Sequence, residues 1–162
     1  MTTLFLLGEN IIMRSISFFV PGQPTPAGSK KVIRAHGKTL VIDASGSRGK
    51  AWRKRIREVA HLHRPDPLLD GPVALVLHFV RPRPKAHYVR DNQLKPSAPL
   101  FPTTRPDLLK LARSVEDALT SVIYKDDAQI VCETLTQCYS AGNNDDIGVY
   151  VTITELGGVL CQ

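Results

Sequence analysis

Two groups of acidic residues flank one helical pattern in the middle of this chain. Asp107 follows Arg105-Pro106, and the pair Asp126-Asp127 interrupts what would otherwise read as an apolar strand. Neighbouring carboxylates repel, so burying them is unfavourable unless a cation or a basic side chain neutralises them. If the helix folds back so that its start lies near Asp127, the carboxylates form an oxygen-ligand site suited to Mg²⁺. The simpler alternatives are a helix-start role for Asp107 and a solvated turn at Asp126-Asp127.

The segment between these acids has the pattern of a helix that buries one face. Apolar residues with the spacing i, i+3, i+4, i+7 are Leu108, Leu111, Ala112, Val115 and Leu119. Thr103 or Thr104 can cap the first turn, and Asp107 is favoured near the positive end of the helix dipole. Asp117 is a poor candidate for the same site, because it lies about 15 Å further along the helix axis than Asp107.

These residues resemble the signature of RusA-type Holliday junction resolvases. The family pattern is roughly Pro-Asp-x-Asp-Asn-x-x-Lys-x-x-x-Asp-Ala-Leu, a short loop, and Asp-Asp-x-Gln. By this resemblance Asp107 takes the place of the first catalytic aspartate and Asp127 that of the last, while Asp126 and Gln129 also match. A second match lies upstream, where residues 22–31 resemble the Gly-x-Pro-x-Pro segment and trailing basic residues that open RusA-type proteins.

The chain departs from the family pattern at the helix start. Leu109 stands at the position of the second catalytic aspartate, and a leucine cannot coordinate a metal or hold a water. Lys110 and Arg113 stand where the family has Asn and Lys, and Arg113 keeps the charge without the compact ammonium group. Leu109 leaves three options open: weakened metal affinity, replacement by another acidic residue, or a relative that binds DNA without cutting it.

The resemblance implies a Mg²⁺-dependent endonuclease that resolves four-way DNA junctions by paired phosphodiester hydrolysis, in DNA recombination and repair. Asp107 and Asp127, with Asp126 as a further ligand, would hold the Mg²⁺, for which Mn²⁺ is an alternative. Lys110 or Arg113 would offset charge that develops in the transition state. The alternative function is a catalytically weakened or inactive protein that binds branched DNA, and a basic structural protein with no nucleic-acid role is the third.

The resemblance also implies the setting in which the protein acts. RusA-type proteins are dimers of bacteria and their phages, and a two-fold dimer matches a junction that needs two symmetric cuts. We therefore expect a homodimer in the cytoplasm of a bacterial cell, encoded by the host or by a phage. The three cysteines lack Cys-x-x-Cys spacing, so neither a zinc site nor a disulfide framework is indicated, which agrees with a reducing cytoplasm.

Composition and length predict one basic domain. The 162 residues are 43% hydrophobic and carry a formal net charge of +6, which suits a polyanionic partner. Residues 1–14 contain an apolar run that is too short to span a bilayer, and Glu9 with no basic start argues against a signal peptide. We expect residues 1–14 to form a flexible extension, residues 15–156 the domain, and residues 157–162 a tail.

We expect the elements that position these residues to form an α+β fold with a mixed β-sheet, hairpins and two main helices. The resemblance implies that this fold is RusA-like. Strands are predicted at Ile16–Val20, Val73–Val80, Ile130–Tyr139 and Ile147–Ile153, and a hairpin at Val32–Ile42 with His36-Gly37 as its turn. One helix begins near Asp107. The other runs from Ser45 or Ser47 to about His63, with an imperfect apolar stripe at Ala51, Trp52, Arg55, Val59 and Leu62 and with Trp52 in the core.

Basic side chains gather on that second helix and on the proline-rich loop 81–102. A solvated basic face and a contact with the DNA backbone both explain the cations of the helix. By the resemblance, the loop would lie beside the active site, where its cations, Arg90 included, would guide a junction arm. The predicted DNA contacts are Lys30, Lys31, Arg53, Lys54, Arg57, Arg81, Arg83, Lys85 and Arg105.

Overall fold

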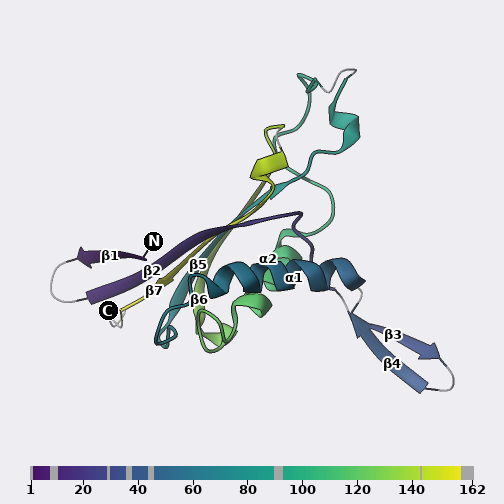
Figure 1. Ribbon diagram of the computed structural model, residues 1–162. Coiled ribbons are helices and arrows are strands. Elements are labelled where there is room, and N and C mark those ends of the chain that lie inside the picture. Colours follow the sequence, from purple (N-terminus) through teal and green to yellow (C-terminus); the bar gives the residue numbers. More distant parts are fainter. Residues whose placement is uncertain are drawn as a thin grey trace.

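A five-stranded sheet is the centre of the molecule (Figure 1). The computed structural model describes residues 2–7, 11–28, 30–35, 38–43, 46–89, 93–142 and 144–157. The sheet has the order β1-β2-β7-β5-β6, made of Thr2–Leu7, Ile11–Pro21, Gly148–Glu155, Val73–Arg81 and Ile130–Tyr139. A separate hairpin pairs β3 (Lys30–Ala35) with β4 (Lys38–Asp43), as predicted, although its turn residues lie outside the described part of the chain.

The sheet is mixed because one of its pairs is parallel. β5 pairs parallel with β6, whereas the β1–β2, β2–β7 and β5–β7 pairs are antiparallel. A parallel pair needs a crossover connection, and the helix α2 (Leu108–Leu119) supplies it between β5 and β6. α2 therefore runs opposite to both strands. Its start lies near the end of β5, and its end lies near the start of β6.

Two helices cover one face of this sheet, α2 over β6 and α1 (Gly46–His61) over β2 (Figure 1). Burial alternates along the strands, as expected for a sheet with one covered face. In β5, Val73, Leu75, Leu77 and Phe79 are fully buried, whereas Val76 between them is exposed. The α+β class and the single domain are thereby confirmed. Among the described residues no helix is long and apolar enough to cross a membrane.

The buried stripe of α1 differs from the predicted one. Its buried residues are Gly49, Trp52, Ile56 and Ala60, while Ala51 and Leu62 are exposed. Trp52 is in the core, as expected. Arginines on both sides of Ile56 concealed the true stripe, because only one apolar residue marks that turn in the sequence.

The N-terminal segment also differs from expectation. Thr2–Leu7 pair with β2 as an edge strand, and β2 begins at Ile11, so strands lie in a segment for which none was predicted. The apolar run 4–7 has strand-forming character and pairs antiparallel with the long strand β2. At the start of α2, the N-cap residue is Asp107 itself, and neither Thr103 nor Thr104 takes that position.

Candidate functional site

The start of α2 presents an exposed carboxylate beside an ammonium group. Asp107 makes no side-chain capping hydrogen bond, and its Oδ2 lies 3.2 Å from Lys110 Nζ, with both side chains more than half exposed. An exposed pair of this kind contributes little stability and separates readily. The Asp107 carboxylate is therefore accessible to a ligand from solvent.

Backbone contacts fix the approach to Asp107. Arg81, at the end of β5, donates hydrogen bonds to the carbonyls of Thr104 at 3.0 Å and Arg105 at 2.8 Å. The Ala27 N–H donates to the Lys110 carbonyl at 2.8 Å, so the loop after β2 lies against the first turn of α2. The structure thereby brings the two stretches that carry the family resemblance side by side.

The arginines of the long loop have internal partners. Arg83 donates to the carbonyls of Ser140 at 2.6 Å and Pro99 at 2.8 Å, and its guanidinium lies 5.5 Å from the centre of the Tyr139 ring. Arg81 and Arg83, both predicted to contact DNA, thus use their donors to hold the loop in place. Lys85 and Arg105 are exposed. Arg90 lies outside the described residues, as do the side chains of Lys30 and Lys31, whose backbone begins β3.

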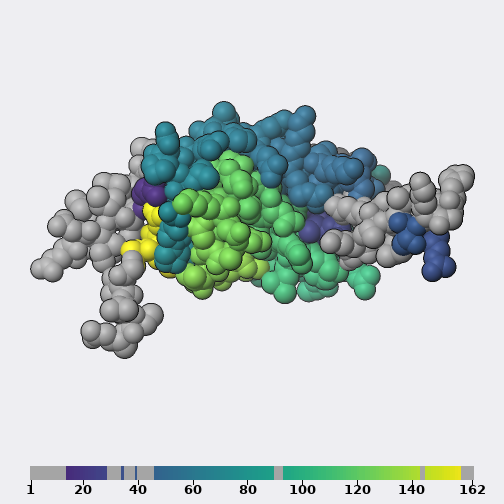
Figure 2. Space-filling view, turned by 90° about the horizontal axis from the view of Figure 1, so that it is seen from below, coloured from purple at the N-terminus to yellow at the C-terminus, as the bar shows by residue number. Residues whose placement is uncertain are grey.

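The predicted DNA-contacting side chains on α1 differ in their exposure and in their partners within the chain. Lys54 Nζ lies 3.7 Å from Glu58 Oε1, both exposed, while Arg57 Nε donates to the Ala118 carbonyl at 3.5 Å near the end of α2. Arg53 is half-buried and has a partner of its own. In Figure 2 the blue surface of α1 lies directly along the green surface of α2 and the turn that follows it. A basic helix therefore borders the second half of the candidate site.

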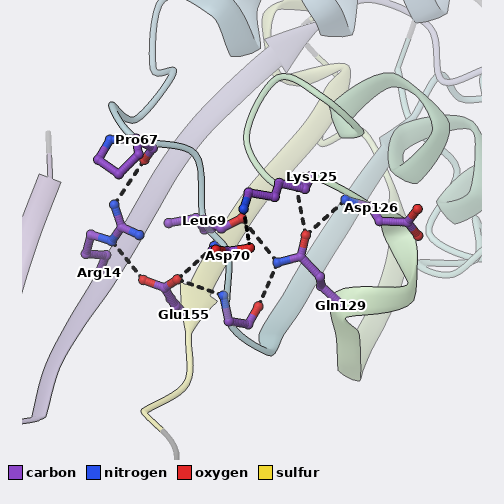
Figure 3. A network of polar contacts seen from close by, with 9 residues as sticks. Arg14, Pro67, Leu69, Asp70, Lys125, Asp126, Gln129 and Glu155 are labelled. Atoms are coloured by element: carbon purple, nitrogen blue, oxygen red, sulfur yellow. Dashed lines mark hydrogen bonds and ion pairs between the residues drawn. The ribbon is translucent and has the colours of Figure 1, made fainter.

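That second half is the turn that carries Asp126 and Asp127 (Figure 3). Asp126 caps a short 3₁₀ helix, Asp127–Gln129, by accepting a hydrogen bond from the Ala128 N–H at 2.8 Å. Gln129 Oε1 accepts from the N–H groups of Lys125 at 2.8 Å and Asp126 at 2.9 Å. The carboxylate of Asp126 is therefore used locally, whereas Asp127 is exposed and makes no hydrogen bond with the described residues through its side chain.

Gln129 ties this turn to the segment before β5. Its Nε2 donates to the carbonyls of Leu69 at 3.1 Å and Gly71 at 2.8 Å (Figure 3). The amide thus makes four hydrogen bonds to backbone groups on two separate segments. The sequence matched Gln129 to the family pattern but gave it no role, and the structure shows that it positions the turn.

An ion pair supports the same region from the other side. Glu155, at the end of β7, lies 2.8 Å from Arg14 Nε and accepts from the N–H groups of Asp70 and Gly71, each at 3.1 Å. The hydrogen bond from Arg14 holds the pKa of Glu155 below its usual range, against the opposing effect of burial. Lys125 Nζ lies 2.6 Å from Asp70 Oδ1. Strand ends and turn are therefore joined in one polar network.

Further carboxylates lie close to Asp127. Burial, followed by the charge and hydrogen bond of Glu133 on β6, raises the pKa of Glu116 to about 7, and Asp117 and Asp127 add to the effect. Buried Tyr124 donates from its hydroxyl to the Glu116 carbonyl at 3.2 Å, and burial, with these acids, raises its pKa too. Sequence reasoning missed Glu116 and Glu133. The i, i+4, i+7 spacing of Leu109, Arg113 and Glu116 was the available sign that Glu116 lies on the same side of α2 as Leu109 and Arg113.

Asp107 and Asp127 lie at opposite ends of α2 within one chain. Asp107 is held near the end of β5 through Arg81, whereas Asp127 is held near its start through Gln129. The 12-residue helix between them is about 18 Å long. The expected fold-back does not occur, because in a parallel crossover the end of the helix joins β6. Among the described residues no group of three or more His, Cys, Asp or Glu could hold a metal, and Asp107 and Asp127 lie too far apart to share one Mg²⁺ within a chain.

A match to a known protein family includes both ends of α2. The family model described as "Endodeoxyribonuclease RusA" matches residues 21–154. The chain belongs to the RusA endodeoxyribonuclease family. Within the RusA match lie Asp107, Leu109 and the Asp126-Asp127 turn. The chain is also 33% identical over 130 residues to the "Uncharacterized protein YqaN" of Bacillus subtilis (strain 168), an alignment that covers 79% of this chain and 90% of that protein.

Proposed function

We propose that this RusA-family chain resolves four-way DNA junctions by paired phosphodiester hydrolysis, in DNA recombination and repair. One observation carries the proposal: the RusA match runs from residue 21 to residue 154 and so includes the whole of α2 with an aspartate at each end. The setting we propose is the cytoplasm of a bacterial cell, with a host or phage gene as the source.

The residues around Asp107 suit a phosphodiester. Among the described residues, the only partner of the Lys110 ammonium is the Asp107 carboxylate in an exposed ion pair, so the ammonium can turn to a phosphate oxygen. Arg113 is exposed one turn further along the helix and presents a second cation. Positive groups placed where negative charge develops stabilise a transition state more than the ground state. We assign Lys110 and Arg113 this role.

We propose Mg²⁺ as the ion, with Mn²⁺ as an alternative, and Asp107 and Asp127 as candidate ligands, which the length of α2 keeps from sharing one ion within a single chain. Carboxylate oxygens are the ligands such hard cations prefer, and a bound divalent ion would lower the pKa of a water and polarise the phosphate. Asp126 is a weaker candidate than the sequence suggested, because its carboxylate already caps the 3₁₀ helix.

DNA contacts outside the reacting groups are proposed for the exposed cations. The exposed face of α1 carries Arg48, Lys50, Lys54, Arg55 and Arg57, and Lys85 and Arg105 lie on the long loop. Such side chains neutralise phosphates and release counterions, so binding should weaken steeply with salt. Arg81 and Arg83 would act indirectly, by holding the loop that presents the others.

A second candidate function is junction binding with weak or absent cleavage. The observation that favours it is Leu109, which is 71% exposed in the first turn of α2, where the family pattern has an aspartate. An exposed leucine there contributes neither a ligand nor a hydrogen bond. The two candidates therefore differ in cleavage and agree in binding.

A labelled four-way junction and a linear duplex of matched sequence, each with and without Mg²⁺, separate these candidates. We expect the wild type to make paired nicks in the junction only, and Asp127→Asn to lose cleavage by on the order of 100-fold while binding persists. Leu109→Asp should cut faster than the wild type. Cleavage by Leu109→Asp alone would establish the binding function, and absence of salt-sensitive junction binding would contradict both candidates.

A further inference from the structure

We propose that Leu100 and Phe101 form a fixed apolar wedge, in which Phe101 covers an open base face at the branch point of DNA. The wedge makes the protein bind branched DNA more tightly than linear duplex. The inference rests on the proposed function in one respect, namely that branched DNA is the substrate. It assigns the selection of that substrate to two residues outside the reacting groups.

Leu100 and Phe101 are adjacent exposed apolar residues in the loop that follows β5. Their side chains are 58% and 61% exposed, although the next residue, Pro102, is buried. Figure 1 shows this loop extending beyond the end of the sheet. Two adjacent large apolar side chains in water forgo the favourable free energy of burial. A ligand that covers them recovers that free energy.

The backbone around this pair is anchored to β6 and to the residue that follows Pro82. The hydrogen bonds to carbonyl oxygens run from Arg83 to Pro99 at 2.8 Å, from the Tyr139 N–H to Leu100 at 2.9 Å, and from Gln137 Nε2 to Pro102 at 3.3 Å. The two prolines also have a fixed φ. Because the backbone is held before a ligand arrives, binding does not have to order it. The exposed side chains are therefore presented by a rigid support.

The same loop continues directly to Asp107. Arg81 holds the carbonyls of Thr104 and Arg105, so the chain between Phe101 and Asp107 is also anchored. The six steps of chain from Phe101 to Asp107 span at most about 20 Å. Phosphates along one strand are about 3.4 Å apart on the helix axis. The wedge therefore lies within about six nucleotides of a phosphate bound at Asp107.

Charge along the loop favours DNA as the partner. Between residues 92 and 106 the sequence contains Lys95 and Arg105 and no acidic residue. Arg105 and Lys85 are exposed. Cations neutralise phosphates, and aromatic side chains stack on the bases between those phosphates. An apolar pair flanked by cations therefore matches the surface of DNA where a base is open to contact.

Branched DNA and linear duplex differ in what the wedge must displace. In a linear duplex the neighbouring base pairs cover both faces of each base pair, so insertion costs the free energy of unstacking. At the branch point of an open four-way junction the stack of each arm ends, and Phe101 covers a base face without that cost. The wedge therefore adds to the affinity for the junction and adds nothing to the affinity for duplex.

Binding without Mg²⁺ tests the wedge in the absence of cleavage. We expect Phe101→Ser to weaken binding of a labelled four-way junction by about tenfold and to leave binding of linear duplex unchanged. Phe101→Tyr keeps the aromatic ring and should keep the affinity for the junction. The matched control is Leu62→Ser, which removes an apolar side chain that is 81% exposed just beyond α1. Circular dichroism shows whether each variant is folded.

Tryptophan fluorescence reports the stacking directly. Trp52 is the single tryptophan of the sequence and is buried, so Phe101→Trp adds one exposed reporter. Stacking on a base quenches tryptophan emission. We expect the emission of Phe101→Trp to fall when the junction is bound and to stay level when linear duplex is bound to the same occupancy, with the wild type as the baseline. Equal quenching by both DNAs would contradict a contact at the branch point.

The outcomes separate the wedge from the proposed function. If the wild type cuts the junction and Phe101→Ser binds junction and duplex as the wild type does, the wedge is overturned and the nuclease function stands. Equal losses of affinity for both DNAs also overturn the wedge. A wild type that binds no junction removes both proposals. A smaller mass of Phe101→Ser than of the wild type by light scattering, with unchanged preference for the junction, would show that the pair covers a second copy of the chain instead of DNA.

Discussion

The two ends of α2 hold their aspartates in different ways. Asp107 lies in an exposed pair with Lys110, whereas Asp127 begins a 3₁₀ helix that Gln129 fastens to two backbone segments. The first end is adjustable, because an exposed ion pair opens readily. The second is fixed by hydrogen bonds that Gln129 donates to carbonyls of the segment before β5, which is distant in sequence. The tertiary structure, more than the helix itself, therefore decides where the acidic turn points.

The largest expected effect comes from releasing the fixed end. Gln129→Leu removes four hydrogen bonds and leaves the Leu69 and Gly71 carbonyls without their side-chain donor, so we expect unfolding in urea to show a loss of about 3 kcal/mol. Junction cleavage should fall further than stability explains, because Asp127 loses its position. Gln129→Glu is the control, since it keeps the acceptor and loses the donor. Wild-type stability in Gln129→Leu would show that the turn holds itself.

Glu155→Gln tests the ion pair with Arg14 that supports the segment bonded to Gln129. We expect the free energy of unfolding to fall by about 2 kcal/mol at neutral pH. The pKa of Glu155 is lowered in the folded protein, so its contribution is present above the ordinary value of 4.5 and is lost as the pH falls through the folded pKa. Wild type and variant should therefore converge in urea stability as the pH falls from 4.5 through the lowered pKa of Glu155 in the folded protein. A difference that persists unchanged in acid would mean that the charge of Glu155 is not what matters.

Glu116→Gln should have a smaller effect and the opposite sign. Because the pKa of Glu116 is raised to about 7, its ionisation destabilises the folded protein as the pH rises from 4.5 through 7. We expect the variant to be more stable by about 1 kcal/mol at pH 8, allowing for solvent screening at this half-buried site, and equal to the wild type at pH 4. Glu133→Gln should act in the same direction through its neighbour. A destabilised Glu116→Gln would contradict the repulsion.

The smallest effect is expected at the adjustable end. Lys110→Met removes one exposed ion pair, so the free energy of unfolding, measured by thermal denaturation, should change by no more than about 0.5 kcal/mol. Junction cleavage should still fall clearly, since Lys110 is assigned to the phosphate. A large loss of stability would erase the contrast between the two ends.

Sequence reasoning succeeded where a pattern is local. The β6 strand was predicted from residue 130 to residue 139 as it is found, and α2 follows from its apolar spacing. It failed where partners are distant in sequence. No periodicity reveals that β5 and β6 are parallel, and that single fact carries the start of α2 away from Asp127. The pairing of Thr2–Leu7 with β2 was missed for the same reason.

The candidate site shows the same division. The motif located Asp107, Asp127 and Gln129 by their neighbours, but the role of Gln129 depends on carbonyls about sixty residues earlier. Arg81 and Arg83 were assigned to DNA by charge, whereas the fold gives them carbonyl partners on other segments. Charge in a sequence identifies a cation and does not say which acceptor it meets.

The position of β7 has a consequence for how the protein is made. Gly148–Glu155 is the last strand in the chain, yet it lies between β2 and β5 in the sheet. A nascent chain therefore cannot pair β2 with the rest of the sheet until residues 148–155 have been synthesised, and we expect the sheet to close late in folding. Translation that stops before residue 148 would leave β2 and β5 without the strand that lies between them, and such exposed strand edges make a chain prone to aggregation.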